Sequence, residues 1–375
     1  MENMVTYVRK TPETFQTKSW NDVDCLVLCQ LVYLKFEDIL PVTEIESSFR
    51  RKKERVTLKC LDNHPEKEKL FRDERYAVTN RALWNAVTAS PRFSALEVDY
   101  VVASLDLSAE TQFCAVTFFL PDGRAFVAFR GTDESIVGWK EDFNLAFSQT
   151  VPAQEKSVIY LNKVAGKIKG AILTGGHSKG GNLAIYAAMN CKPSVQKRLE
   201  QIYSMDGPGF RTEILEQGHY DRIAARVKKI LPQSSLVGML FERSKDFEVI
   251  ESRAIGLLQH DPMSWVVRNG AFVRSKKMAV SAMRLDDTIN DWLDTLDEEH
   301  TRVFVNTIFE VLNATESDNL IDLGMDRWKH MQMILSAMAQ LDDETKEAVK
   351  SVFHTFFELS KEHLTLPKKN RRKNI

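Results

Sequence analysis

The sequence feature that most constrains this chain is a serine enclosed by glycines. Residues Gly176-His177-Ser178-Lys179-Gly180 fit the pattern G-x-S-x-G, with an apolar run before them (171–173) and a helical run after them (183–189). Small residues two positions before and after the serine let a strand and a helix approach closely around a strained turn. The segment therefore predicts a strand, a tight turn with the Ser178 hydroxyl at its tip, and a helix. A structural or phosphate-binding glycine-rich loop is the alternative.

The size and composition of the chain are those of an ordinary globular protein. Its 375 residues suffice for one large domain, or for a main domain with an appendage. Hydrophobic residues make up 43% and charged residues 27%, which are usual values for soluble proteins. The 51 basic and 52 acidic residues nearly cancel, so we expect no nucleic-acid partner. Peripheral contact with a membrane stays open.

The N-terminal residues and the cysteines indicate a cytoplasmic protein. Residues 1–18 are polar and charged, so no secretory signal is expected, and no apolar run approaches the ~18 residues of a transmembrane helix. The five cysteines are odd in number and mostly lie in apolar runs, which is typical of reduced thiols. Cys25 and Cys29 lie four residues apart, but no second Cys or His pair is near them. We therefore expect no metal site and no cofactor.

The order of predicted elements indicates an α/β fold. We expect a flexible lead-in over 1–20, a helix capped by Asn21, and strands over 96–107, 111–120 and 124–130, the last two forming an antiparallel hairpin. Helices and strands then alternate. The helices are predicted over 135–149, 154–167, 179–190, 211–223 and 262–268, and the strands over 170–174, 202–205, 227–231 and 247–252. This alternation predicts a mostly parallel sheet with right-handed crossovers.

The chain changes character after Arg274. Four apolar stripes at helical spacing predict a helical C-terminal region over 275–366, followed by a basic tail over 367–375. The α/β domain is accordingly predicted to span 21–274. We interpret the helical region as an appendage or a partner-binding bundle.

A serine hydroxyl needs a base to take its proton, and the base needs a group that orients it. His260 is the preferred base, because it follows the last predicted strand after a short loop and could reach back to Ser178. His219 is the second choice. Asp206 is the preferred acid, because it ends a predicted strand at the sheet edge where open α/β sheets place their sites. Asp246 and Glu251 are other candidates for the acid.

Acyl transfer also needs donors for the oxyanion that forms on the substrate. The backbone N–H of Lys179, the residue after the serine, is one candidate. The loop that ends the strand over 124–130 supplies a second, because Thr132 could give its backbone N–H and its hydroxyl. A plain strand-ending turn at Gly131 is the alternative.

The two motifs together resemble a known family. Val127-Ala128-Phe129-Arg130-Gly131-Thr132, with Trp139 and Asp142 downstream, and the glycine-rich segment over 176–181 are similar to the class 3 (fungal-type) lipase superfamily. The likeness covers roughly residues 20–270 and is closer to an uncharacterised bacterial lipase-like branch. It implies an α/β-hydrolase fold with Ser178 as the nucleophile. It also implies an oxyanion hole of Thr132 and Lys179, and a base that fits His260.

The chain departs from that family at two places. Many class 3 lipases have Leu where this chain has Lys179, and their acid follows a later strand, where this chain has Ser234-Ser235. The acid could have moved to Asp206, or a serine or a carbonyl could orient His260.

The expected function is a serine hydrolase that cleaves carboxylic esters, either small molecules or acyl lipids, through an acyl-enzyme. A catalytically impaired hydrolase-fold protein that binds partners is the alternative, favoured by the missing acid after the later strand. A nucleotide-binding protein is a third and weaker hypothesis, because the P-loop spacing G-x-x-x-x-G-K-[ST] is absent.

Overall fold

The computed structural model describes residues 2–47, 49, 55–72, 77–106, 111–132, 151–242, 246–254, 256–275 and 278. Within these ranges the main sheet has eight strands that lie side by side in chain order. They are β1 (Val56–Thr57), β2 (Glu97–Asp106), β3 (Thr111–Phe119), β4 (Ala125–Phe129), β5 (Ile172–His177), β6 (Leu199–Met205), β7 (Val227–Pro232) and β8 (Glu248–Ile250). β1 to β4 pair antiparallel and β4 to β8 pair parallel. The predicted α/β-hydrolase-type sheet with an opening antiparallel hairpin is confirmed.

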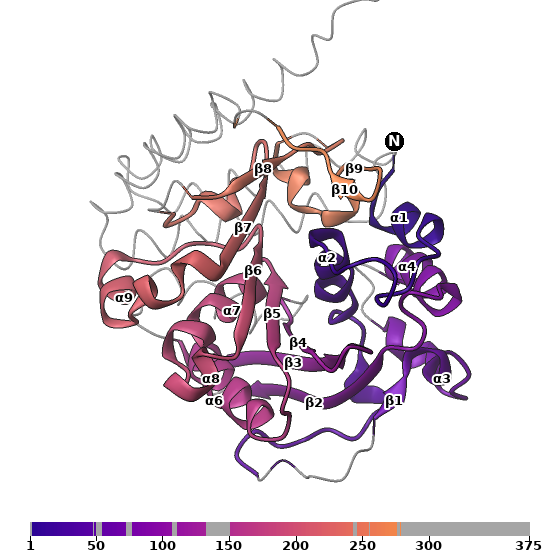
Figure 1. Cartoon of the computed structure of the whole chain (residues 1–375), viewed down its shortest axis with the longest axis horizontal. Helices are drawn as coiled ribbons and strands as arrows, with labels where there is room; N and C mark the ends of the chain where they lie inside the picture. Colours follow the sequence, from indigo (N-terminus) through magenta and orange to yellow (C-terminus); the bar gives the residue numbers. More distant parts are fainter. Residues whose placement is uncertain are drawn as a thin grey trace, which may run out of the picture.

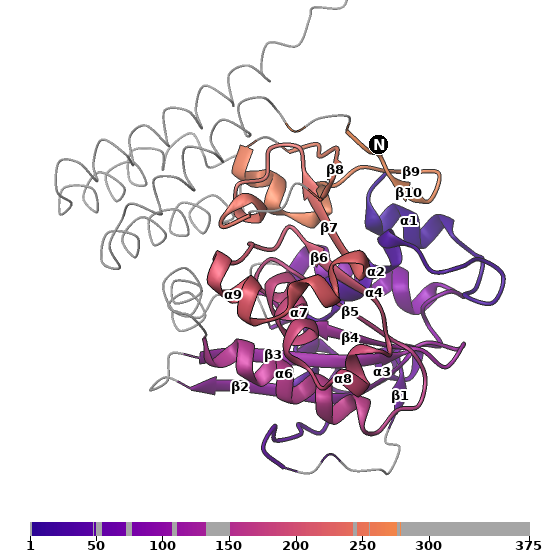
Figure 2. The same cartoon turned by 60° about the vertical axis from the view of Figure 1, so that its left-hand side comes forward.

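Helices cover both faces of this sheet, as Figure 1 shows for its central strands. One face is packed against α1 (Met4–Lys10), α2 (Asp22–Leu31), α3 (Leu58–Asp62) and α4 (Ala77–Ala89). The other is packed against α6 (Pro152–Ala165), α7 (Lys179–Asn190), α8 (Pro193–Gln196) and α9 (Thr212–Gln217). The view of Figure 2 places α7 beside β5 and β6. Short 3₁₀ helices link these elements, and η5 (Val237–Met239), η6 (Gly256–His260) and η7 (Pro262–Ser264) lie near the C-terminal edge of the parallel strands.

The residue pattern of the central strands explains the two layers. Successive side chains of a strand point to opposite faces, so Phe126 and Ala128 of β4 join the core under α2, while Val127 and Phe129 join the core under α7. All of these side chains are buried, as expected for strands covered on both sides. The α2 helix begins as predicted: the Asn21 side chain accepts a hydrogen bond from Asp24 N, and the Asp24 carboxylate accepts one from Asn21 N.

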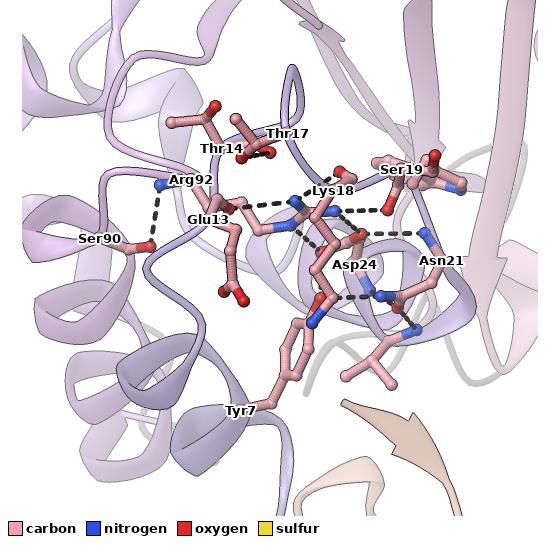
Figure 3. A network of polar contacts seen from close by, with 12 residues as sticks. Tyr7, Glu13, Thr14, Thr17, Lys18, Ser19, Asn21, Asp24, Ser90 and Arg92 are labelled. Carbon is pink, nitrogen blue, oxygen red and sulfur yellow. Dashed lines mark hydrogen bonds and ion pairs between the residues drawn. The ribbon is translucent and has the colours of Figure 1, made fainter. Parts of the chain in front are cut away.

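The prediction of a flexible lead-in over 1–20 is wrong. Asn3 caps α1, and the apolar face of α1 is buried against α2 and α4. The segment is also fixed at both ends. Val267 N donates to Glu2 O at 2.9 Å. The Arg92 guanidinium donates to Lys18 O at 2.9 Å, as Figure 3 shows. A short amphipathic helix in a polar sequence was missed because its stability comes from packing rather than from local preference.

Two predicted helices are corrected by the structure. The helix over 211–223 is only α9 (Thr212–Gln217), because the backbone turns left-handed at His219. The helix predicted over 262–268 is absent: η7 ends at Ser264, and β9 (Val267–Arg268) pairs antiparallel with β10 (Ala271–Phe272). Asn269 and Gly270 both have positive φ between these strands, which is the Asn-Gly signal for a hairpin.

Several predictions lie outside the described residues. These are the helix over 135–149, the basic tail over 367–375 and the helical region over 275–366, of which only Ser275 and Met278 are described. In the part of the chain that the structure describes, no helix has the length and apolar character needed to cross a membrane.

Candidate active site

Ser178 occupies a strained turn between β5 and α7. Its φ of 57° and ψ of −131° are unfavourable for a residue with a side chain. The turn is tight because Gly176 and Gly180 lie against each other and against the end of β4, so that a Cβ on either would collide with backbone. The Ser178 N–H donates to the Met205 carbonyl at 2.9 Å, which continues the pairing of β5 with β6. The predicted strand, turn and helix around Ser178 are therefore present.

Asp206 directly follows β6, one residue beyond the carbonyl that Ser178 binds. Its N–H donates to Ile230 O of β7 at 2.9 Å, and its side chain is fully buried. The backbone φ of Asp206 is 52°, a left-handed conformation that Asp tolerates better than most residues. The carboxylate thus lies at the carboxyl edge of the sheet, beside the Ser178 turn.

His260 ends η6 and contacts Asp206 directly. Its Nδ1 lies 2.7 Å from Asp206 Oδ2, and both side chains are buried. A carboxylate accepts hydrogen bonds, so Nδ1 carries the proton in the neutral ring and Nε2 has the lone pair. The three residues predicted as nucleophile, acid and base are thus brought to one edge of the sheet from β5, β6 and the segment after β8.

The second oxygen of Asp206 is held by Ser235. The Ser235 hydroxyl donates to Asp206 Oδ1 and accepts a hydrogen bond from Gly238 N at 3.0 Å. Ser235 follows β7, where the resembling lipases carry their acid. In this chain the loop after β7 supplies a hydroxyl to a carboxylate located one strand earlier.

The loop that bears His260 is fixed by neighbouring side chains. The Trp265 indole N–H donates to Gln259 O at 2.8 Å, and the Gln259 amide oxygen accepts from Ser234 N at 2.9 Å. Gln259 and Trp265 are buried. These contacts hold Gln259, the residue directly before His260, through both its backbone carbonyl and its side chain.

The loop Arg130-Gly131-Thr132 lies beside the Ser178 turn, because a Cβ on Gly131 would collide with His177 O. The Arg130 guanidinium holds this loop against the end of α2. It donates to Val32 O at 2.7 Å and forms two bonds with the Glu37 carboxylate at 2.6 and 2.8 Å. Burial opposes ionisation of Glu37, but the charge and hydrogen bonds of Arg130 outweigh it and lower the pKa of Glu37.

Lys179 is the first residue of α7, and its side chain is buried. Its Nζ donates to the backbone and side-chain oxygens of Gln112, both at 3.2 Å. The ammonium group is thereby drawn toward the start of β3, while the backbone N–H of Lys179 belongs to the first turn of α7 after Ser178.

The other candidates lie elsewhere or cannot be placed. His219 is exposed after α9, Asp246 is exposed before β8, and Glu251 directly follows β8. Trp139 and Asp142 lie outside the described residues. Among the residues that the structure describes, no three His, Cys, Asp or Glu side chains are grouped so that they could bind a metal ion.

Sequence reasoning missed two residues beside the candidate base, of which His177 contacts His260 and Tyr33 contacts His177. His177 and Tyr33 are joined by a hydrogen bond of 3.1 Å, and His177 contacts His260. The position of His177 next to Ser178 was the only local signal. Tyr33 gave no signal, because its contact depends on how the end of α2 packs against β5.

The comparisons agree with the predicted resemblance to lipase-like proteins. The family model described as Mbeg1-like, a lipase-like family, matches residues 87–310, which is more than half of the chain. A crystal structure of M37 lipase is similar over 82% of this chain and 98% of that chain, with 12% identity and a TM-score of 0.37. None of the curated proteins matches. The chain belongs to the Mbeg1-like family.

Proposed function

We propose that this protein is a serine hydrolase that cleaves carboxylic esters through an acyl-enzyme. The observation that carries the proposal is the 2.7 Å contact between His260 Nδ1 and Asp206 Oδ2, beside a serine in a strained strand-to-helix turn. A histidine that is oriented by a carboxylate is the kind of base that makes a serine hydroxyl nucleophilic, and we propose that His260 acts on Ser178 in this way. Ser178 is then the nucleophile, His260 the base and Asp206 the acid.

The proposed reaction has two halves. In the first, His260 Nε2 takes the Ser178 proton as Oγ attacks the ester carbonyl carbon, and it returns that proton to the alcohol that leaves. In the second, His260 takes a proton from water as the water oxygen attacks the acyl-enzyme, and it returns the proton to Ser178 as the carboxylic acid leaves. Asp206 accepts the Nδ1–H bond throughout and stabilises the imidazolium that forms in each half.

The oxyanion is proposed to bind the backbone N–H groups of Lys179 and Thr132. The first stands at the start of α7, where the partial positive charge of a helix N-terminus favours an anion. The second lies on the loop that the Arg130–Glu37 pair holds against α2. Donors held in place before the reaction stabilise the oxyanion without reorganising.

The proposed substrate is an ester of a small molecule or an acyl lipid. The proposed location is the cytoplasm, which suits the five free cysteines. A catalytically impaired protein was the alternative because the acid after the later strand is missing. The Asp206–His260 contact favours the enzyme, since it supplies a carboxylate for that role.

The experiment combines ester hydrolysis with covalent labelling. Purified protein is incubated with p-nitrophenyl butyrate, and separately with a fluorophosphonate probe whose site is mapped by mass spectrometry. We expect wild type to hydrolyse the ester and to be labelled at Ser178, and Ser178→Ala to lose both. Ser157→Ala is the matched control, because this buried serine bonds its own helix α6 through Gln154 O. A folded Ser178→Ala protein with wild-type turnover would refute the proposal.

A further inference from the structure

His177, the residue before the proposed nucleophile, contacts the backbone of the proposed base. It ends β5 and is 1% exposed. Its Nε2 lies 2.9 Å from His260 O, and its Nδ1 lies 3.1 Å from the Tyr33 hydroxyl. The two imidazole rings lie 4.6 Å apart between centroids, with an angle of 33° between their planes. His177 thus meets His260 through both a hydrogen bond and a ring contact.

The partners of His177 determine where its proton lies. A backbone carbonyl only accepts hydrogen bonds, so the Nε2 that faces His260 O carries the proton. In a neutral ring Nδ1 is then an acceptor, and the Tyr33 hydroxyl is the donor that it faces. The contacts therefore select the neutral tautomer with the proton on Nε2.

We propose that His177 is a positioning residue that holds His260 in its catalytic orientation, with Tyr33 fixing the tautomer of His177. This inference rests on the proposed function. His260 is fixed at two points, because Asp206 binds its ring at Nδ1 and His177 binds its backbone carbonyl. With the Asp206 bond alone, a shift of the His260 backbone could turn Nε2 away from Ser178, whereas a second bond at the carbonyl also fixes the backbone from which the ring projects.

The neutral state of His177 also suits the proposed chemistry. His260 becomes an imidazolium in each half of the reaction, and its ring lies 4.6 Å from that of His177. A positive charge on His177 would oppose the charge that forms on His260. A neutral ring that accepts from Tyr33 gives support without this repulsion.

Three variants separate positioning from simple filling of the core. His177→Phe keeps a planar ring but loses both hydrogen bonds. His177→Gln places an amide N–H at the length of Nε2 and serves as the conservative rescue. Tyr33→Phe removes only one hydroxyl. Thermal unfolding midpoints are measured alongside kcat and KM for p-nitrophenyl butyrate.

We expect His177→Phe to lower kcat about 100-fold with KM nearly unchanged, since misplacing a catalytic group by about 1 Å costs that much. We expect kcat of His177→Gln to be roughly tenfold higher than kcat of His177→Phe, because the glutamine restores part of the positioning effect. We expect kcat of Tyr33→Phe to be roughly tenfold lower than that of wild type, because this variant loses only part of the same effect. If His177→Phe does not fold, Tyr33→Phe decides the question. A folded His177→Phe with wild-type kcat, or no recovery in His177→Gln, would overturn the inference.

A measurement that needs no turnover separates this inference from the proposed function. Long-range ¹H–¹⁵N spectra of the imidazole rings in wild-type protein report the tautomer of His177, which is assigned by loss of its signals in His177→Gln. We expect protonated Nε2 and unprotonated Nδ1. Protonated Nδ1 would overturn the positioning contact even in an inactive protein. An unlabelled and inactive wild type with the expected tautomer would refute only the proposed function.

Discussion

Each oxygen of the Asp206 carboxylate is engaged by a different loop. Oδ2 faces His260 Nδ1 at 2.7 Å and Oδ1 accepts from the Ser235 hydroxyl. A fully buried carboxylate is stable only when such donors replace its water. Two donors from two loops also fix the plane of the carboxylate, so the direction in which it presents Oδ2 to His260 is set. At the scale of single residues, the geometry of the candidate site is therefore set by the hydrogen bonds that one buried carboxylate accepts.

Replacing Asp206 tests the assignment of the acid. Asp206→Asn retains the size of the side chain, but its amide group favours the His260 tautomer with the proton on Nε2, which cannot act as a base. We expect kcat for p-nitrophenyl butyrate to fall about 10⁴-fold with the fold preserved. Steady-state kinetics and circular dichroism measure both effects.

The control for this substitution is Asp246→Asn, which alters an exposed carboxylate that the sequence also offered as the acid. It should retain wild-type kcat. If the Asp246 variant lost activity and the Asp206 variant kept it, the acid would be misassigned.

Site residues that a local sequence pattern marks could be predicted from the sequence, whereas site residues whose contacts arise from packing between distant segments could not. Ser178, Asp206 and His260 were selected because a motif and the ends of strands mark them, and the structure brings them to one edge. The contacts of Tyr33 and His177 arise only when α2 packs on β5. No spacing in the sequence encodes a contact between residues separated by 144 positions.

At the scale of elements, the loop after β4 depends on a neighbouring helix for its position. Arg130 joins this loop to the carbonyls of Val32 and Leu34 and to the Glu37 carboxylate. The helix α2 ends where those carbonyls need donors, and the guanidinium supplies them. The hairpin of β9 and β10, in contrast, depends on a local signal, because the pair Asn269-Gly270 indicates a tight turn. The sequence analysis did not use this signal.

The Arg130–Glu37 pair predicts a pH dependence of stability. Arg130 lowers the pKa of Glu37 below its usual 4.5 in the folded protein, so the pair stabilises fully above about pH 4.5. The contribution of the pair to the free energy of unfolding is lost as the pH falls from about 4.5 through the lowered pKa of Glu37 in the folded protein. At pH 7 we expect Glu37→Gln to lower the free energy of unfolding by about 1.5–3 kcal/mol, the scale of hydrogen bonds to charged groups.

Urea unfolding of wild type and Glu37→Gln from pH 7 to pH 3 measures this effect. The difference in unfolding free energy between the two proteins should narrow below about pH 4.5, where Glu37 in the wild type takes up a proton. Subtracting the variant removes the contribution of the other carboxylates that titrate there. A difference that stayed constant or widened on acidification would contradict the assigned pair.

At the scale of the whole molecule, the N-terminal segment is bonded to the segment that follows His260. Val267 N donates to Glu2 O at 2.9 Å, and the Asn3 amide donates to Met263 O at 3.1 Å. Met263 and Val267 follow closely on His260, so α1 supports the segment that carries the proposed base. Figure 1 shows α1 beside the hairpin of β9 and β10. The sequence did not indicate this role, because both contacts join residues more than 250 positions apart.

The same segment is held at its other end by a buried ion pair. Arg92 Nε donates to Asp24 Oδ1 at 2.7 Å, and both side chains are fully buried. The guanidinium also donates to the carbonyls of Glu13, Lys18 and Ser19, and the Tyr7 hydroxyl donates to Asp24 (Figure 3). One guanidinium thus binds the chain between α1 and α2 and the first turn of α2.

Removing Arg92 should therefore destabilise the whole domain. Arg92→Leu leaves the Asp24 carboxylate buried with an uncompensated charge, and we expect the free energy of unfolding to fall by about 3–5 kcal/mol. Urea unfolding followed by tryptophan fluorescence measures the loss. The control is Arg124→Leu, which removes more exposed ion pairs with Asp122 and Glu200 and should cost about 1 kcal/mol or less.

A second variant tests the cause of that loss. In the double variant Arg92→Leu with Asp24→Asn, the uncompensated charge is gone, so the two substitutions together should cost less than the sum of their separate effects. Additive costs would mean that Arg92 acts only through the three carbonyls.

Whatever the cause of the loss, a folded Arg92→Leu protein should lose esterase activity at lower urea concentrations than wild type, because α1 supports the His260 segment through Glu2 and Asn3. Activity that outlasted the unfolding of the N-terminal segment would show that this support is dispensable.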